Sequence, residues 1–129
     1  DEILYSPLLR AADTAKHISE VTGIACREEI RLKEQNFGRY ESTARDGKEF
    51  AKAKMNFVDD FDGGETMLHL CQRIYNLIDD IKNDSEDKVY LLVAHNGISR
   101  VVQSYFNNMT NEEFSAFGIK NCELKKYIF

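Results

Sequence analysis

Hydrophobic positions along the chain alternate between short apolar runs and longer stretches with a helical repeat. Apolar runs predict strands at residues 2–6, 24–30 and 88–94. The last run, KVYLLVA, has no polar interruption after its first residue, which is typical of a parallel strand covered by helices on both faces. Apolar residues at helical spacing predict helices over Leu8–Val21, Thr66–Ile81 and about Ile98–Phe106.

The remaining stretches carry weaker signals. Gly23 is the predicted C-cap of the first helix, and residues 43–58 favour a charged helix, followed by a turn-rich break at 59–66. Thr110 and Glu113 form a capping-box pattern, and residues 122–129 predict a half-exposed edge strand. Strands and helices alternate almost throughout, which predicts a three-layer α/β/α sandwich with a mainly parallel sheet.

Composition excludes several classes of protein. A chain of 129 residues fits one domain, with 43% hydrophobic and 30% charged residues. The net charge is -5 and the basic residues are scattered, which argues against a nucleic-acid surface. No apolar stretch approaches the roughly 20 residues of a membrane span. The three cysteines form no Cys-x-x-Cys pair, so we expect reduced thiols in a cytoplasmic protein and no metal site.

Polar residues that could bind an anion follow two of the predicted strands. His95 ends the apolar run at 88–94, while Ser6 and Arg10 follow the run at 2–6. The carboxyl ends of parallel strands share one edge of a sheet, where ligands bind, and a helix start after His95 would add free N–H groups. A histidine at a strand end is more often a structural hydrogen-bonded residue, so position alone supports a phosphate pocket only weakly.

Four motifs, found in a fixed order along the chain, favour the phosphate pocket over a purely structural histidine. They are YSPLLRAADTA at 5–15, LKEQNFGRYES at 32–42, GGET at 63–66 and VAHNGISR at 93–100. Together they strongly resemble the histidine phosphatase superfamily, and NCELKKYIF at the end is similar to the family's last strand. The resemblance implies a phosphoglycerate-mutase-like fold.

The resemblance also implies roles for individual residues. In this family, the histidine of an Arg-His-Gly motif attacks the phosphoryl group and becomes a phosphohistidine. His95 matches the second histidine, which contacts the phosphoryl oxygens, and Arg10 matches a pocket arginine. Glu34 matches the carboxyl group that protonates the leaving oxygen and then activates water. We therefore expect His95, Glu34 and Arg10 to be catalytic, with Ser6 and Asn96 joining them in binding phosphate, and no metal or other cofactor.

Four other polar residues rank lower as site residues. Glu65 belongs to the GGET motif, although stabilisation of a helix N-terminus explains a glutamate there equally well. Arg100 is expected to pack or pair on its helix, and His17 and His69 are expected to be structural or solvated.

The Arg-His-Gly motif itself does not occur in these 129 residues. We expect it in an upstream segment, so that residues 1–129 form a single, N-terminally incomplete domain with a short cap at about 39–63 and little activity alone. A pseudoenzyme is the alternative. Ser42, where the family often has glycine, and Thr66, where serine is common, are mild departures that bear on substrate fit.

The predicted function is metal-independent hydrolysis of a small phosphomonoester. A phosphoglycerate mutase is the second hypothesis, which the short stretch of about 30 residues between Glu34 and Glu65 disfavours, because mutases of the family usually carry a longer insertion there. A non-catalytic domain that binds a phosphorylated ligand is the third. A homodimer is left open, and no nucleic-acid or membrane partner is expected.

Overall fold

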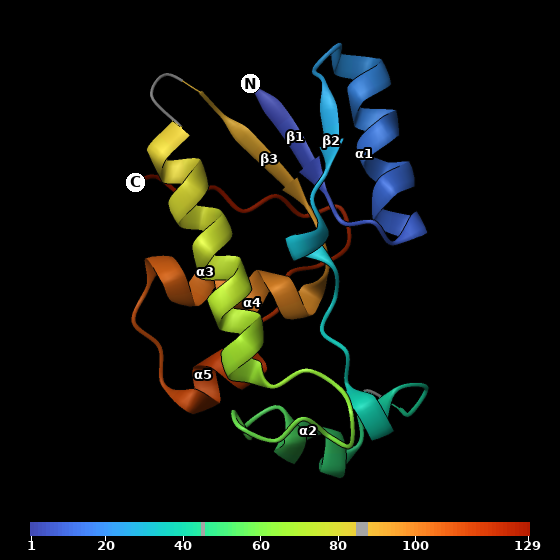
Figure 1. Ribbon diagram of the computed structural model, residues 1–129, viewed down its shortest axis with the longest axis vertical. Coiled ribbons are helices and arrows are strands. Elements are labelled where there is room, and N and C mark those ends of the chain that lie inside the picture. The colour runs from blue at the N-terminus through green and yellow to red at the C-terminus, as the bar shows by residue number, and fades with distance from the viewer. Residues whose placement is uncertain (45, 85–87) are drawn as a thin grey trace.

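Three parallel strands form the sheet in a computed structural model that describes residues 1–44, 46–84 and 88–129. They are β1 (Glu2–Tyr5), β2 (Cys26–Glu28) and β3 (Tyr90–Val93), in the order β2-β1-β3. Ile3 pairs with Cys26 on one side and with Leu91 on the other. The predicted parallel sheet is confirmed, and all three strands end at the same edge (Figure 1).

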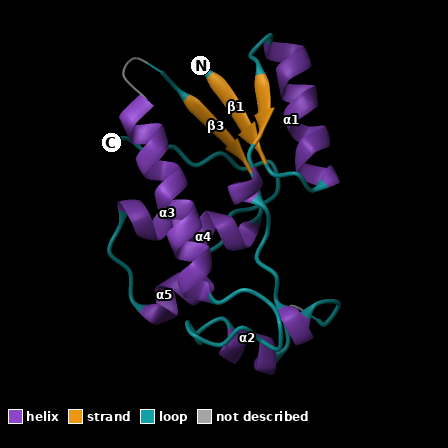
Figure 2. Ribbon diagram, viewed as in Figure 1, coloured by secondary structure: helices purple, strands orange, loops and turns teal. Residues whose placement is uncertain are grey.

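Helices connect and cover these strands. They are α1 (Leu9–Thr22), α2 (Lys48–Ala53), α3 (Met67–Asp84), α4 (Asn96–Phe106) and α5 (Asn111–Ala116), with 3-10 turns at Ile30–Leu32 and Gly38–Tyr40. Figure 2 shows α1 and α3 on opposite sides of the strands. The segment with α2 lies beyond the carboxyl ends of the strands, where a cap was expected (Figure 1). Within the described residues, no helix is long and apolar enough to cross a membrane.

The central strand β1 explains the layering. Ile3 and Leu4 are 0% and 1% exposed, and successive strand residues face opposite sides of a sheet. Leu4 belongs to the main core with buried residues of α3 and α4, among them Leu70, Ile74, Leu77, Ile98 and Val101. Ile3 therefore faces α1, whose buried residues Ala11, Ala12 and Ala15 are small enough to bring that helix close to the strand. The α/β fold is confirmed.

Local signals placed most helix ends correctly. Gly23 ends α1 at a φ of 72°, and its N–H donates to Ser19 O, as expected for a glycine C-cap. Thr110 and Glu113 make the predicted capping box of α5. Helix α4 begins two residues earlier than predicted, because His95 is extended, at φ -132° and ψ 166°, and occupies the N-cap position itself.

Two predicted elements were wrong. Among the described residues of 43–58, only Lys48–Ala53 is α-helical, since the apolar residues there are too few for a longer buried face. The predicted strand at 122–129 is absent, although all of these residues are described. Ile128 is 77% exposed, and Tyr127 instead donates a hydrogen bond to Gln103 on α4. A strand needs a neighbour with a free edge, and no described strand lies against this segment.

Candidate active site

The ends of β1 and β3 bring Ser6 and His95 together. Ser6 N–H donates to Val93 O at 3.0 Å, which continues the pairing of the two strands. The Ser6 hydroxyl then lies 2.7 Å from His95 Nε2, and the two residues are 0% and 9% exposed. This hydrogen bond orients the imidazole at the start of α4, and the N-terminus of a helix favours an anion.

Glu34 reaches the same helix start from the segment that follows β2. Its carboxylate accepts hydrogen bonds from Gly97 N at 3.2 Å and from Gln35 N at 2.9 Å. A Cβ atom at residue 97 would overlap Glu34 Oε1, so only glycine lets the carboxylate come this close to α4. Gly97 of the Asn-Gly pair therefore also makes room for the Glu34 carboxylate.

The charged residues that act on His95 are Glu34 and Arg10. Burial lowers the pKa of His95, the Glu34 carboxylate acts in the opposite direction, and the Arg10 guanidinium lowers it further. Arg10 is exposed on the first turn of α1. Both Arg10 and Glu34 therefore lie within electrostatic reach of His95. The structure thus brings together Ser6, Arg10, Glu34 and His95.

An ion pair holds the segment that carries Glu34. Arg73 on α3 makes two hydrogen bonds to the Glu65 carboxylate, from Nε at 2.7 Å and from Nη2 at 2.9 Å. Its guanidinium also donates to the carbonyl groups of Arg31 and Lys33. Gln35 donates to Glu65 O at 3.0 Å. Glu65 is therefore a structural residue, and its carboxylate pairs with Arg73 rather than with the start of α3.

Asn96 is the predicted site residue whose side chain points elsewhere. Its Oδ1 accepts hydrogen bonds from Ile119 N at 2.9 Å and from Ser99 Oγ at 3.2 Å, which ties α4 to the C-terminal segment. Its backbone N–H belongs to the first residue of α4, directly after His95. His17 and His69 are exposed on α1 and α3, as the sequence suggested.

Sequence reasoning missed the supporting residues. Arg73 lies eight residues after Glu65, about two helical turns, and this spacing was the available signal for their pairing. Arg100 was expected to pack or pair on α4, and it does pack, being 7% exposed. It does not pair, however, since its Nε and Nη1 have no hydrogen-bond partner in the described structure.

Comparison with known proteins assigns the chain to a family. The profile of the histidine phosphatase superfamily (branch 1) matches residues 1–129. The chain belongs to this superfamily. A search of curated proteins finds no match.

Solved structures share the histidine phosphatase fold. A mycobacterial glucosyl-3-phosphoglycerate phosphatase aligns with a TM-score of 0.69 at 23% identity, over 90% of this chain and 62% of that one. Its complex with VO3 aligns with a TM-score of 0.71 at 25% identity, over 91% and 63%. The alpha-ribazole phosphatase of Shigella flexneri gives 0.70 at 20% identity, over 93% and 63%. The chain thus spans less than two thirds of these proteins.

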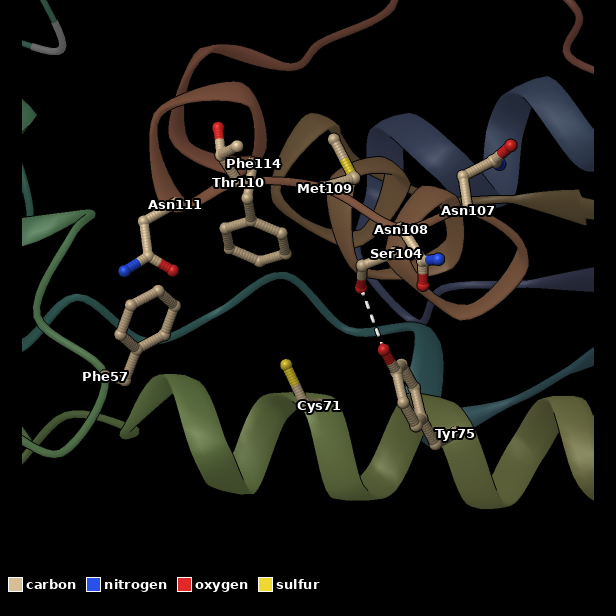
Figure 3. A pocket seen from close by; sticks show the side chains of 10 residues that line it. All are labelled: Phe57, Cys71, Tyr75, Ser104, Asn107, Asn108, Met109, Thr110, Asn111 and Phe114. Carbon is tan, nitrogen blue, oxygen red and sulfur yellow. Dashed lines mark hydrogen bonds between the residues drawn. The ribbon is translucent and has the colours of Figure 1, made fainter.

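A cavity elsewhere in this histidine phosphatase chain is less suited to catalysis. It measures about 320 Å³ and lies between α3, α4 and α5, lined by side chains such as Phe57, Cys71 and Phe114 (Figure 3). Tyr75 and Ser104 share a 3.0 Å hydrogen bond at its wall. Burial raises the pKa of the Cys71 thiol, which makes it a poor nucleophile. In the described ranges, no three His, Cys, Asp or Glu side chains are grouped so as to hold a metal ion.

Proposed function

We propose that the complete protein hydrolyses small phosphomonoesters without a metal, through a phosphohistidine intermediate. The observation that carries this proposal is the convergence of the Ser6–His95 pair and Glu34 on the start of α4, with Arg10 at the rim. Phosphoryl transfer needs positioning and neutralised oxygens more than covalent help, and these residues supply both.

The phosphoryl group would sit over the His95 ring. The Arg10 guanidinium would bind its oxygens, joined by the Asn96 N–H and the positive end of the α4 dipole. A bound dianion raises the pKa of His95, because it favours the charged imidazolium. His95 would then donate a hydrogen bond to a phosphoryl oxygen and stabilise the charge of the transition state. Ser6 keeps the ring oriented and can share the same oxygen.

Glu34 would supply and then remove a proton. An alkoxide leaving group needs a general acid, and the same carboxylate can afterwards activate the water that attacks the phosphohistidine. The two hydrogen bonds from Gly97 and Gln35 hold this carboxylate next to the proposed phosphoryl position.

The attacking histidine would come from a segment upstream of residue 1. In the described structure, β1 has a strand on each side, whereas β3 has one only along the β1 edge. All four β3 residues are half-buried despite being apolar or aromatic. A further parallel strand along β3 would cover them, and a histidine following it would lie at the same sheet edge as His95.

Similar proteins support a phosphorylated small-molecule substrate. Those compared above include phosphatases named for glucosyl-3-phosphoglycerate and for alpha-ribazole, and one of them was solved with inorganic phosphate. We extend phosphatase activity to this chain as part of the proposal. A cytoplasmic location fits its three free cysteines.

The test begins with the intact mass and N-terminal sequence of the natural protein, which we expect to show an upstream strand ending in Arg-His-Gly. That protein should hydrolyse p-nitrophenyl phosphate in the presence of EDTA. His95→Ala should slow hydrolysis by about 10²–10³-fold, the usual cost of removing a group that stabilises transition-state charge. The exposed His17→Ala is the control and should keep full activity. Full activity of His95→Ala would refute its role. Isomerisation of 3-phosphoglycerate faster than hydrolysis would indicate a mutase.

A further inference from the structure

Glu34 lies in a segment without regular secondary structure. Residues 33–37 connect the 3-10 turns Ile30–Leu32 and Gly38–Tyr40 and belong to no helix or strand. The carboxylate of a general acid has to be placed accurately, because a displacement of about 1 Å can cost about 10²-fold in rate. Contacts from outside the segment must therefore fix the backbone on both sides of Glu34.

Arg73 fixes the residues before Glu34. Its Nη1 donates a hydrogen bond to Arg31 O, and its Nη2 donates to Lys33 O at 2.8 Å. Lys33 directly precedes Glu34 in the chain. Helix α3, which carries Arg73, is a firm support, because its buried residues form much of the main core. The guanidinium thus ties the backbone beside Glu34 to a well-packed helix.

Glu65 fixes the residues after Glu34. Its backbone N–H donates to Asn36 O at 2.8 Å, and its carbonyl oxygen accepts a hydrogen bond from Gln35 Nε2 at 3.0 Å. Its carboxylate accepts from Nε and Nη2 of Arg73, so the ion pair joins the two anchors into one unit. The neighbours of Glu34 in both directions are therefore bonded to this pair, while the Glu34 carboxylate itself is turned toward α4.

We propose that Arg73 is a positioning residue for the general acid, holding the backbone around Glu34 so that its carboxylate meets the leaving oxygen. This role rests on the proposed function, in which Glu34 protonates that oxygen. In the described structure, the hydrogen bonds of the Arg73 guanidinium go to Glu65 and to two carbonyl groups of the segment, so Arg73 acts through Glu34 and not on the substrate. Loss of Arg73 therefore slows the reaction most where the leaving group most needs a proton.

Two aryl phosphates of similar shape test this role in the complete protein. Phenolate is a stronger base than p-nitrophenolate, so phenyl phosphate depends more on the general acid than p-nitrophenyl phosphate does. We expect Arg73→Gln to lower kcat/KM for phenyl phosphate about tenfold more than for p-nitrophenyl phosphate. Arg73→Lys keeps the charge but not the planar fork, and should show part of this selective loss. In a Glu34→Gln background, Arg73→Gln should add no selective loss, because the acid is already absent.

Arg31→Gln is the matched control. The Arg31 side chain also joins this part of the chain to α3, through Asp80 at 2.6 Å, and its other hydrogen bonds in the described structure go to Glu29. Its ratio of the two kcat/KM values should stay that of the unmodified protein. The same selective loss in Arg31→Gln as in Arg73→Gln would overturn the proposal. Equal losses on both substrates in Arg73→Gln would overturn it as well, since they indicate a purely structural role.

A measurement without substrate separates the positioning role from the phosphatase proposal. The Gly97 N–H donates to the Glu34 carboxylate, so the NMR shift of this amide should follow the protonation of Glu34. Arg73→Gln should abolish this pH dependence, whereas Arg31→Gln should keep it, and an unchanged dependence in Arg73→Gln overturns the positioning role. If the complete protein hydrolyses neither aryl phosphate, the phosphatase proposal fails and the Gly97 amide decides the positioning role alone. If Arg73→Gln does not fold, Arg73→Lys replaces it in both measurements.

Discussion

Two glutamates from the sequence motifs, Glu34 and Glu65, each act on an arginine. The two arginines differ in how many of their side-chain donors form hydrogen bonds. Glu65 and Arg73 satisfy each other with two hydrogen bonds, and the remaining donors of Arg73 go to backbone carbonyls. The Glu34 carboxylate favours the charged form of Arg100, but Arg100 keeps two buried donors without a partner in the described structure. A complete set of bonds is typical of a structural pair. Arg100, by contrast, retains two buried donors that no described residue accepts from.

The largest expected difference between the pairs is catalytic. Glu34→Gln in the complete protein should slow hydrolysis of p-nitrophenyl phosphate by about 10²–10⁴-fold, because an amide cannot donate the proton. Glu65→Gln should change kcat far less, since that carboxylate faces Arg73 and not the phosphoryl position. Steady-state kinetics of both variants check this. Equal losses in the two would show that the distinction between them is wrong.

The second difference is in stability. Arg73→Met should lower the free energy of unfolding by about 2–3 kcal/mol, because it leaves the Glu65 carboxylate and two carbonyl groups without their donor. Arg100→Met should be neutral or stabilising by about 1 kcal/mol without ligand, because it removes an unpaired buried charge. Urea denaturation of both variants measures the contrast, and a marked destabilisation by Arg100→Met would contradict it.

A smaller effect should follow from crowding Glu34. Gly97→Ala places a methyl group where Glu34 Oε1 lies, so the carboxylate must move away from α4. We expect kcat to fall by about tenfold, roughly 1.4 kcal/mol of transition-state stabilisation. Gly47→Ala is the control, because its nearest neighbour there is Ala44 O at 3.4 Å and its φ is negative. The same loss in both variants would exclude displacement of Glu34 as the cause.

The smallest predicted effect is on the pH dependence of stability. The pKa of His95 lies below its ordinary value of 6.5 in the folded chain, so the unfolded chain binds the proton more readily. The free energy of unfolding should therefore fall as the pH drops below about 6.5, and stop falling below the folded pKa. His95→Gln should make this loss of stability smaller, because the variant has no imidazole to protonate. Denaturation at pH 7.5 and 5.5 checks it, and an identical pH dependence in the variant would refute it.

Local sequence patterns predicted helices and strands well wherever a single residue or a short hydrophobic repeat determines where the element begins or ends. Gly23 and the Thr110–Glu113 box mark helix ends through contacts a few residues apart. The apolar run before His95 marks β3 in the same way. The strand expected at 122–129 failed because strand formation depends on a neighbour far away in the sequence, and no described strand pairs with this segment.

By itself, the sequence determined the parallel α/β fold, the superfamily and the residue types around His95. Only the tertiary structure decided which charges are paired: that Glu65 binds Arg73, that Glu34 lies against Gly97, and that Arg100 is buried without a partner. The physical reason is distance along the chain. Propensity and period act over one or two turns, whereas an ion pair depends on which side chains the finished fold brings within about 4 Å.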